Sequence, residues 1–405
     1  MSGATAPCPT RHAIVLAAGE SKRTRPLTLN RPKPLIALLD RPLLAHILDE
    51  LVGIVDRVTL VVGYRADALR QLFGDSYRGM QLEYVLQTQI NGTAGALLAV
   101  VAAAQAGTIP ALEESFLLLY GDNLISRVDV QGVCQQAYCL AALRVADPRA
   151  FGILELDGAR VMGILEKPSD PPPDALANPG IYHFGPAARA ALPAIQPSPR
   201  GEYELTDLIG MLAQHHAVGY HICQGHWIPV GTGWDVLIAS QFLLEKQHRS
   251  EIHPEAQLAD DCHITGAVQI GRAKIGARCR IRGPVWIGDE VVIGDDCTLD
   301  RTVLLDGTTI GAGSQIEHSV LGLGVEVGEL NTVQWSVLDD VVRLGTHVVL
   351  RARVFLDIQP VADTAGLLDD TAMQWRGAVI GRGVVVDDGQ SVEPGSVLFP
   401  PEATP

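Results

Sequence analysis

The chain has 405 residues, of which 47% are apolar and 19% charged, a composition typical of a folded globular protein. Its formal net charge of −15 argues against nucleic acid or an anionic membrane as a partner, because both attract basic surfaces. The length exceeds that of one ordinary hydrophobic core and predicts two domains.

Seven cysteines are present, and no two of them form a C-x-x-C pair. An odd number without metal-like spacing predicts buried or free thiols in a reducing compartment. The chain shows no N-terminal signal pattern, and its longest apolar stretch, residues 94–104, is too short to span a bilayer. We therefore expect a cytoplasmic protein.

Residues 12–250 alternate short apolar runs with helical patterns and follow an N-terminus, residues 1–11, that we expect to be flexible. The apolar runs predict strands at residues 13–18, 58–62, 82–86, 116–119 and 180–184, and the helical patterns lie at 66–73, 94–106 and 234–247. This alternation predicts a doubly wound, Rossmann-like α/β domain, in which ligands bind at the carboxyl ends of parallel strands.

The first predicted strand ends in a loop of small residues that carries a cluster of cations. Residues 16–28 have the sequence LAAGESKRTRPLT, and residues 31–35 have the sequence RPKPL. The cations of this region are Lys22, Arg23, Arg25 and Lys33. A strand end with many backbone N–H groups and fixed positive charges is suited to bind a triphosphate. The sequence therefore predicts chemistry at a phosphate in this half of the chain.

From residue 251 onward the pattern changes to a repeat with a step of six residues, occasionally five. Apolar residues recur at Ile264, Ile270, Ile275, Ile281, Ile287, Ile293, Leu299, Leu305, Ile310, Ile316, Leu321, Val327, Val333, Leu338 and Leu344. The period, with glycine often following directly, predicts a β-solenoid of hexapeptide repeats over residues 251–405. The period breaks near residues 357–376, where we expect an acidic loop insertion, and resumes at residue 379.

The cation-rich loop resembles the signature of the sugar-1-phosphate nucleotidylyltransferases, L-A-[AG]-G-x-G-T-R-L-x-P-L-T followed by P-K-P. With its repeats, the whole chain resembles the long members of that family. These include bifunctional N-acetylglucosamine-1-phosphate uridylyltransferase/glucosamine-1-phosphate acetyltransferases and long glucose-1-phosphate thymidylyltransferases. The resemblance implies that the repeats form a left-handed parallel β-helix, often trimeric. It also implies that a nucleoside triphosphate, with UTP or dTTP favoured, reacts with a sugar 1-phosphate to give an NDP-sugar and pyrophosphate.

The resemblance assigns catalytic roles to three residues. Arg23 falls on the family's catalytic arginine, whose planar fork would neutralise charge on the leaving pyrophosphate, and Lys33 falls on the phosphate-binding lysine. Asp122 follows an apolar strand and falls on the Mg²⁺ ligand, a role that suits a carboxylate at a strand end. The plainer alternatives are a solvated surface arginine and a helix N-cap aspartate.

Residues 87–93, with the sequence QTQINGT, resemble the base-reading segment of the family. The Gln87 amide would face a pyrimidine edge, and Gly92 would let the backbone approach the base closely. Taken alone, this segment is more often a plain loop. The implied nucleotide-binding set is Leu16, Ala17, Ala18, Gly19, Gln87, Gly92 and Thr93.

A second implied set would bind the sugar phosphate. Its members are Gly152, Glu166, Lys167, Asn178 and Gly180. The resemblance implies that Glu166 accepts hydrogen bonds from sugar hydroxyls and that Lys167 holds the phosphate. Any one of these residues alone is compatible with a surface position. A further segment, residues 202–207, also resembles the family and is expected to be structural.

The loop and the last segment of this domain depart from the family pattern. Ser21 stands where the family usually has glycine. Pro229, in residues 227–232 (WIPVGT), stands where the family has the aspartate that is its second metal ligand. Proline offers no side-chain acceptor, and we do not expect Asp235 to replace it. Two interpretations follow: a slower enzyme that holds one Mg²⁺ through Asp122 and the phosphates, or a sugar-nucleotide-binding sensor or partner subunit with little catalysis.

The β-helix also departs from the pattern of the acetyltransferase members. Their catalytic histidine lies in a segment like P-H-L-N-Y-V-G-D, and the best match here, residues 328–335 (GELNTVQW), has Glu329 at that place. The other histidines considered, His263, His318 and His347, lie outside this context. We therefore favour nucleotidyl transfer without acetyl transfer, with the bifunctional enzyme as an alternative. The β-helix would then be an oligomerisation or regulatory module, with a homotrimer favoured.

Overall fold

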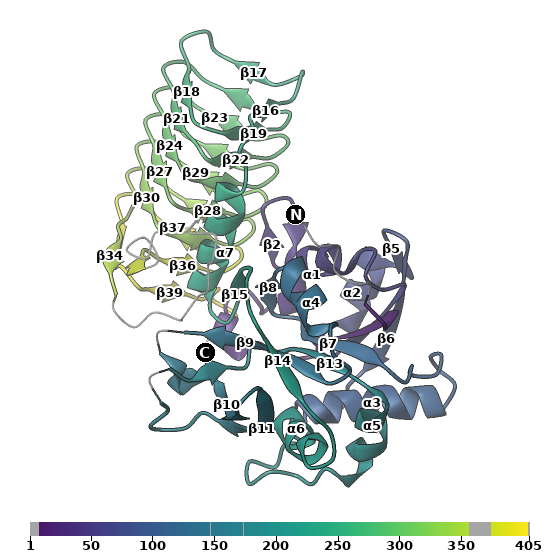
Figure 1. The fold of residues 1–405 in the computed structure, drawn as a ribbon. Coiled ribbons are helices and arrows are strands. Elements are labelled where there is room, and N and C mark those ends of the chain that lie inside the picture. The colour runs from purple at the N-terminus through teal and green to yellow at the C-terminus, as the bar shows by residue number, and fades with distance from the viewer. Residues whose placement is uncertain (1–7, 146, 173, 356–373, 404–405) are drawn as a thin grey trace.

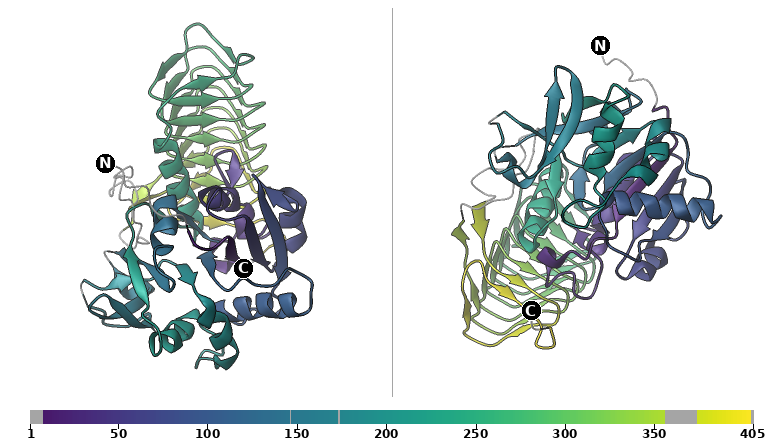
Figure 2. Two further views of the ribbon diagram at one scale, coloured as in Figure 1. Left: turned by 45° about the vertical axis from the view of Figure 1, so that its right-hand side comes forward. Right: turned by 90° about the horizontal axis from the view of Figure 1, so that it is seen from below.

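The computed structural model describes residues 8–145, 147–172, 174–355 and 374–403. A sheet-and-helix domain forms one end of the molecule, and an elongated stack of short strands rises from it (Figure 1). The last coils of the stack lie beside the sheet domain and the first coils point away, as both figures show (Figures 1 and 2). The predicted fold class is confirmed: a Rossmann-like α/β domain is followed by parallel strands consistent with a left-handed β-helix.

Within the described residues, the first domain contains an 11-stranded mixed sheet. Its parallel centre has the order β7-β1-β4-β6, with β1 (His12–Ala17), β4 (Arg57–Val62), β6 (Met80–Leu86) and β7 (Phe116–Tyr120). The largely apolar sequences of these strands fit a sheet buried on both faces. The remaining strands are β5 (Ser76–Tyr77), β9 (Cys139–Arg144), β10 (Gly152–Asp157), β11 (Arg160–Glu166), β12 (Leu176–Ala177), β13 (Ile181–Phe184) and β14 (Gly219–Ile222).

Helices cover both faces of this sheet, and the apolar residues form two cores, one on each face. One core contains α1 (Leu43–Leu51), α2 (Ala66–Phe73), α4 (Arg127–Val133) and α7 (Gly233–Glu245), and the other contains α3 (Thr93–Gln105), α5 (Pro186–Ala191) and α6 (Leu205–Ala213). Two small ribbons pair β2 (Ala37–Leu38) with β3 (Arg41–Pro42) and β8 (Asn123–Ile125) with β15 (Trp227–Pro229). Short 3₁₀ turns lie at Lys22–Thr24, Lys33–Leu35, Pro148–Ala150 and Leu192–Ala194.

In the described part of the chain, the β-helix has three parallel sheets that run along its axis. The first has eight strands: β16 (Glu251–Ile252), β19 (Val268–Ile270), β22 (Val285–Ile287), β25 (Val303–Leu304), β28 (Val320–Leu321), β31 (Val337–Leu338), β36 (Val379–Ile380) and β39 (Val397–Leu398). The second has seven: β17 (Gln257–Leu258), β20 (Lys274–Ile275), β23 (Val292–Ile293), β26 (Thr309–Ile310), β29 (Glu326–Val327), β32 (Arg343–Leu344) and β37 (Val385–Val386). The third also has seven: β18 (His263–Thr265), β21 (Arg280–Arg282), β24 (Thr298–Asp300), β27 (Gln315–Glu317), β30 (Thr332–Gln334), β33 (Val349–Leu350) and β38 (Ser391–Val392).

The interior of the β-helix follows the predicted repeat, with one shift. Leu304 is the residue that stacks on Ile287 and Leu321 inside the helix, whereas the pattern had pointed to Leu305. Leu305 instead joins the apolar cluster shared with the sheet domain. Successive side chains of a strand point to opposite sides, so a shift of one residue exchanges the interior for the exterior.

The predicted loop insertion near residues 357–376 lies mostly outside the described residues. The last two residues of the predicted insertion form β35 (Trp375–Arg376), which pairs antiparallel with β34 (Arg353–Val354). The coil register continues across it, because Val337 pairs with Val379 and Leu350 pairs with Val392. The described coils before and after this stretch are therefore stacked in one continuous register.

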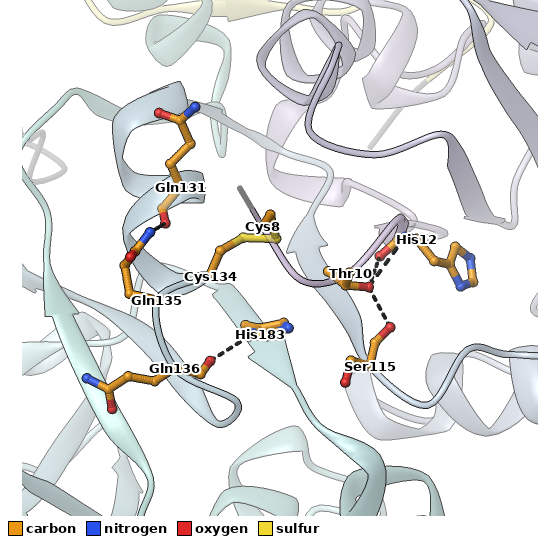
Figure 3. The surroundings of a disulfide bond; sticks show 9 residues. All are labelled: Cys8, Thr10, His12, Ser115, Gln131, Cys134, Gln135, Gln136 and His183. Carbon is orange, nitrogen blue, oxygen red and sulfur yellow. Dashed lines mark hydrogen bonds between the residues drawn. A yellow bond between two sulfur atoms is a disulfide. The ribbon is translucent and has the colours of Figure 1, made fainter. Parts of the chain in front are cut away.

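The N-terminal segment and one cysteine pair differ from the sequence predictions. Cys8 and Cys134 form a disulfide beside α4 (Figure 3), so the expectation of thiols alone is wrong for these two. The other five cysteines of the described chain are free. The Thr10 hydroxyl donates to the carbonyl of Ser115 at 2.5 Å. Residues 8–11 are therefore held on the sheet domain, and the rest of the segment that we expected to be flexible, residues 1–7, lies outside the described residues.

One apolar cluster joins the two domains. It contains Leu237 and Phe242 of α7 together with Val303, Val320 and Val337 from the outer face of the eight-stranded sheet. Helix α7 lies along the β-helix in Figure 1. Burial of this shared apolar surface stabilises one arrangement of the two domains.

Among the described residues, we find no helix with the length and apolar character that crossing a membrane requires.

Candidate active site

A cavity of about 690 Å³ opens at the carboxyl ends of β1, β6 and β7. Its lining residues are Leu16, Ala17, Ala18, Gly19, Glu20, Ser21, Lys22, Arg23, Lys33, Pro34, Gln87, Ile90, Gly92, Thr93, Ala96, Tyr120, Gly121, Asp122, Glu202 and Gly231. All seven predicted nucleotide-binding residues and all three predicted catalytic residues belong to this lining. A cavity at this edge of a doubly wound sheet is the usual ligand position of the fold.

The loop after β1 is turned by Ser21, which has φ 53° and ψ 41°. This left-handed conformation is the one that glycine, the usual family residue, would adopt at no steric cost. The Ser21 carbonyl accepts hydrogen bonds from the Thr24 amide and the Thr28 hydroxyl, both at 3.0 Å. The Thr24 hydroxyl in turn donates to the carbonyl of Gly231 at 2.9 Å. The loop is therefore formed with serine in place and is tied to the segment that precedes α7.

The three predicted catalytic side chains lie in the cavity in different states. Arg23 is exposed, while Lys33 is only 7% exposed and sits in the short turn after Pro32. The Lys33 ammonium lies 3.1 Å from Asp122 Oδ2. The Asp122 carboxylate is about half exposed, with 47% of its side-chain surface accessible. The cavity therefore contains a nearly buried cation beside an accessible carboxylate, and a phosphate or a metal ion can reach this pair.

Two further cations of the loop have other surroundings. Lys22 is exposed and forms an ion pair with Glu20 at 2.8 Å. Arg25 lies outside the cavity lining and borders a neighbouring hollow of about 430 Å³. Of the four cations that the sequence grouped together, Arg25 is therefore the one that the fold separates from the cavity.

The predicted base-reading segment is held together by its own hydrogen bonds. The Gln87 amide nitrogen donates to Asn91 Oδ1 at 3.2 Å and to the Gly92 carbonyl at 3.3 Å. Gly92 has φ 101°, and a Cβ at this position would lie 2.4 Å from the Tyr203 carbonyl oxygen. The glycine is thus required by the packing of this chain. Residues 202–207, expected to be structural, support the segment here, because the Leu205 amide donates to the Thr93 hydroxyl at 3.0 Å.

The five predicted sugar-phosphate residues gather beside the cavity, outside its lining. Gly152 pairs with Glu166 across β10 and β11, and its carbonyl accepts from the Asn178 amide at 2.9 Å. Asn178 Oδ1 accepts from the Gly180 amide at 3.1 Å. The Lys167 ammonium lies 3.8 Å from the Glu166 carboxylate. These residues therefore form one group, with an acid and a base facing each other.

Tyr120 connects this group to the cavity, and the sequence prediction missed it. Its amide donates to the Gly180 carbonyl at 3.0 Å, and its hydroxyl lies 3.3 Å from that of Tyr182, which also accepts from Asn178 at 2.6 Å. Burial raises the pKa of Tyr120 to about 12, so the phenol remains a neutral donor. Its position before the Gly-Asp pair was the available signal. Glu202 is a second lining residue that the prediction had treated as structural.

A divalent cation could bind here through Asp122. In the described ranges, no group of three or more His, Cys, Asp and Glu side chains is arranged for a metal. Mg²⁺ commonly needs only one or two carboxylates when substrate phosphates and water complete its shell, so the residues fit a Mg²⁺ brought with a nucleotide. Pro229 lies opposite Asn123, the residue after Asp122, in the β15–β8 ribbon. The place of the missing carboxylate is therefore adjacent to Asp122.

Asp235 does not fill that place. Its side chain caps α7, where Oδ2 accepts from the amides of Gly231 at 2.8 Å and Thr232 at 2.6 Å. The carboxylate is 4% exposed, and burial raises its pKa despite these bonds. The side chain thus fixes the start of α7. That it does not replace the missing metal ligand stays an expectation.

The β-helix histidines lie in ordinary surface or packing positions. His318 stacks on Trp335 with ring centroids 4.0 Å apart, and burial lowers its pKa to about 4. The amide of His347 donates to the carbonyl of Glu329, the residue at the place of the acetyltransferase histidine, at 2.9 Å. In the part of the chain that the structure describes, neither the His318 nor the His347 side chain forms a hydrogen bond or ion pair with a carboxylate, the pairing that a general base would use.

Comparison with known proteins agrees with this division of the chain. The nucleotidyl transferase family model matches residues 12–246, and the GMPPB C-terminal domain model matches residues 270–365. The Bifunctional protein GlmU of Methanocaldococcus jannaschii is 29% identical over 352 residues, which cover 86% of this chain and 82% of that protein.

Two further relatives resemble the chain over nearly their whole length. The glucose-1-phosphate thymidylyltransferase of Streptomyces antibioticus is 31% identical, over 78% of this chain and 93% of its own. The low-salt glycan biosynthesis nucleotidyltransferase Agl11 of Haloferax volcanii is 28% identical over the same shares. The chain therefore belongs to the nucleotidyl transferase family, among the sugar-1-phosphate nucleotidylyltransferases with a C-terminal extension.

Proposed function

We propose that the protein transfers a nucleotidyl group from a nucleoside triphosphate, UTP or dTTP in preference to others, to a sugar 1-phosphate. The products are an NDP-sugar and pyrophosphate. The observation that carries this proposal is the cavity in which Arg23, Lys33 and Asp122 meet the base-reading segment at the ends of three parallel strands.

In this reaction, an oxygen of the sugar phosphate attacks the α-phosphorus in line, and the bond from phosphorus to the pyrophosphate oxygen breaks. Little covalent work is left to the protein, so positioning and charge stabilisation dominate. Lys33, held in place by burial, would bind phosphate oxygens near the α-phosphorus, and the exposed Arg23 would close on the leaving pyrophosphate. Tyr120 would separate the sugar group from the triphosphate end of the cavity.

Mg²⁺ is part of the proposal. Asp122 would hold it, and the ion would neutralise negative charge that builds up on the phosphates. Nearly buried Lys33, 3.1 Å from Asp122 Oδ2, would orient that carboxylate before the ion arrives. We further propose a cytoplasmic protein whose partners are these two substrates, which acts on neither nucleic acid nor a membrane, and which forms a homo-oligomer, in preference a trimer, through the β-helix.

Pyrophosphate release tests this function. Five nucleoside triphosphates (UTP, dTTP, GTP, CTP and ATP) are combined with several sugar 1-phosphates in the presence of Mg²⁺. One pair is expected to react well above the background of Asp122→Ala, while Asp157→Ala, a change of an exposed carboxylate on the β10–β11 hairpin, keeps the wild-type rate. Silence of the folded wild-type protein with every pair would contradict the proposal.

Pro229 favours a second candidate, a sugar-nucleotide-binding sensor or partner subunit with little turnover. Its position beside Asp122 puts a proline where the family pattern has the second metal-binding carboxylate. Tight binding of an NDP-sugar, measured by calorimetry, without pyrophosphate release in the same preparation would support this candidate. Acetyl transfer, suggested by relatives named Bifunctional protein GlmU, is tested by acetyl-CoA turnover with an aminosugar phosphate. We expect none, because Glu329 occupies the histidine position.

A further inference from the structure

The loop that carries the candidate catalytic cations is fastened to the β-helix. Arg31, two residues before Lys33, reaches across the domain boundary with Nη2 hydrogen-bonded to Asp339 Oδ1 and, at 2.8 Å, to Asp340 Oδ2. The three side chains are 17%, 7% and 10% exposed, so the cluster is largely removed from water. A planar guanidinium that bridges two carboxylates has little freedom to move.

The β-helix holds these two carboxylates rigidly. They follow β31, where the Asp339 amide donates to the Ile380 carbonyl at 2.8 Å. Asp340 Oδ1 accepts from the Leu323 amide at 3.1 Å, and its Oδ2 also accepts from Arg382 at 3.0 Å. Three successive coils of the stack therefore fix the acceptors to which Arg31 binds.

Two more contacts place the same part of the β-helix against two segments whose neighbouring residues line the cavity. Gly381 lies so close to Pro26 of the loop that a Cβ would stand 2.7 Å from the proline Cβ. Gly233, two residues after Gly231 of the cavity lining, lies equally close to Val379. The last coils thus press on the loop after β1 and on the start of α7, the two segments joined by the Thr24–Gly231 hydrogen bond.

We propose that Arg31 is a positioning residue through which the β-helix holds Lys33 in the geometry for nucleotidyl transfer. Arg31 lies outside the cavity lining, so it acts through the backbone of the Pro32–Lys33–Pro34 turn and not through contact with substrate. The role rests on the proposed function. It makes the β-helix part of the active-site scaffold, in addition to any role in assembly.

The full-length variants Arg31→Met, Arg31→Lys and Asp340→Asn test this role. Arg31→Met is expected to lower kcat about 10- to 100-fold, since a displacement of about 1 Å at a reacting group costs on the order of 100-fold. The KM for the sugar 1-phosphate should change by less than about twofold, because its binding group lies on the other side of Tyr120. Arg31→Lys should recover part of the loss, and Arg31→Met/Asp340→Asn should lose little more than Arg31→Met alone.

Arg301→Met is the matched control. Arg301 forms an ion pair across the same domain boundary with Glu245 of α7, away from the cavity. Equal losses in Arg301→Met and Arg31→Met would overturn the proposal in favour of general domain adhesion. An active Asp339→Asn/Asp340→Asn variant, which removes both negative partners of Arg31, beside an inactive Arg31→Met would overturn it in favour of direct contact between Arg31 and substrate.

Hydrogen–deuterium exchange separates this proposal from the proposed function. The amides of residues 21–36 should exchange faster in Arg31→Met and Asp340→Asn than in the wild type and in Arg301→Met, whether or not the wild type releases pyrophosphate. Unchanged exchange in this loop would overturn the positioning role. If Arg31→Met does not fold, Arg31→Lys and Asp340→Asn carry both measurements.

Discussion

The sheet domain and the β-helix use polar side chains in opposite ways. At the strand ends of the sheet domain, Arg23 and Asp122 remain accessible. Inside the β-helix, buried hydroxyls and amides bond to the next coil, as when the Thr308 hydroxyl donates to the Gly322 carbonyl at 3.0 Å. The first arrangement leaves polar groups free to bind a ligand, whereas in the second the polar groups bond to each other and stabilise the fold. Variants of the two regions should therefore fail in different ways.

The largest effect is expected at Arg23. Arg23→Met removes a cation that would stabilise the leaving pyrophosphate and should lower kcat about 100- to 1,000-fold, about 3–4 kcal/mol of transition-state stabilisation. The melting temperature should stay near that of the wild type, because the side chain is exposed. Arg11→Met, which removes an exposed arginine at the opposite end of β1, is the control. Equal activity of the two variants would show that Arg23 is a solvated surface residue.

A polar residue in the β-helix should show the converse behaviour. Asn331 is 1% exposed, donates to the carbonyls of Gly328 at 2.9 Å and Gly345 at 2.8 Å, and accepts from the Val348 amide. Asn331→Ala leaves buried partners unpaired and should lower the free energy of unfolding by about 3 kcal/mol, with kcat of the folded protein unchanged. Urea unfolding measures this, with exposed Gln315→Ala as the reference. An Asn331→Ala variant as stable as the wild type would contradict the view that buried polar side chains stabilise the β-helix by bonding to neighbouring coils.

Acid should affect the sheet domain more than the β-helix. In the first domain, burial lowers the pKa values of four histidines, and that of His12 falls to about 3; the others are His46, His183 and His226. In the described β-helix, burial lowers the pKa of one histidine, His318. Below pH 6.5 these histidines bind protons in the unfolded chain but stay neutral in the folded chain. The free energy of unfolding therefore falls as the pH falls.

For His12 alone, the loss between pH 6.5 and 4.5 should be about 2–3 kcal/mol. Hydrogen exchange at pH 7 and pH 5, corrected for its intrinsic pH dependence, should show protection lost first in β1 and β4. His12→Gln should flatten that dependence. A free energy of unfolding of this domain that rises as the pH falls would contradict the lowered pKa values of its histidines.

The smallest effect sharpens the question of the second metal ligand. Pro229→Asp would place a carboxylate beside Asp122, and the Mg²⁺ concentration for half-maximal activity should fall about tenfold, or about 1.4 kcal/mol. Pyrophosphate release over a Mg²⁺ series measures it, with Pro229→Ala to separate the loss of proline from the gain of the acid. No difference between the two variants would mean that position 229 does not reach the metal.

Much of the fold could be predicted because local patterns determine it. The helix at residues 66–73 has the predicted bounds, and the hexapeptide period located the coils. The exchange of Leu304 for Leu305 shows where period alone fails, since two adjacent leucines satisfy it equally. For the site, the predicted residues of the first strand's loop line the cavity, because strand ends in this fold converge.

What the sequence could not predict depends on pairs that are distant along the chain. The Cys8–Cys134 disulfide joins residues 126 positions apart, and nothing near either cysteine signals its partner. The pairing of Arg31 with Asp339 depends on how two domains pack, which neither domain's pattern encodes. Tyr120 was visible as a residue before Gly-Asp, but its contact with Tyr182 exists only after β7 and β13 pair.

The most direct test of the central claim follows the α-phosphate itself. UTP or dTTP labelled with ³²P at the α-position is incubated with Mg²⁺ and a sugar 1-phosphate, and the products are separated. The account predicts that the label appears in the NDP-sugar, that pyrophosphate is unlabelled, and that Arg23→Met slows the transfer about 100- to 1,000-fold. Label that stays in the triphosphate, or that appears only as nucleoside monophosphate, would contradict it.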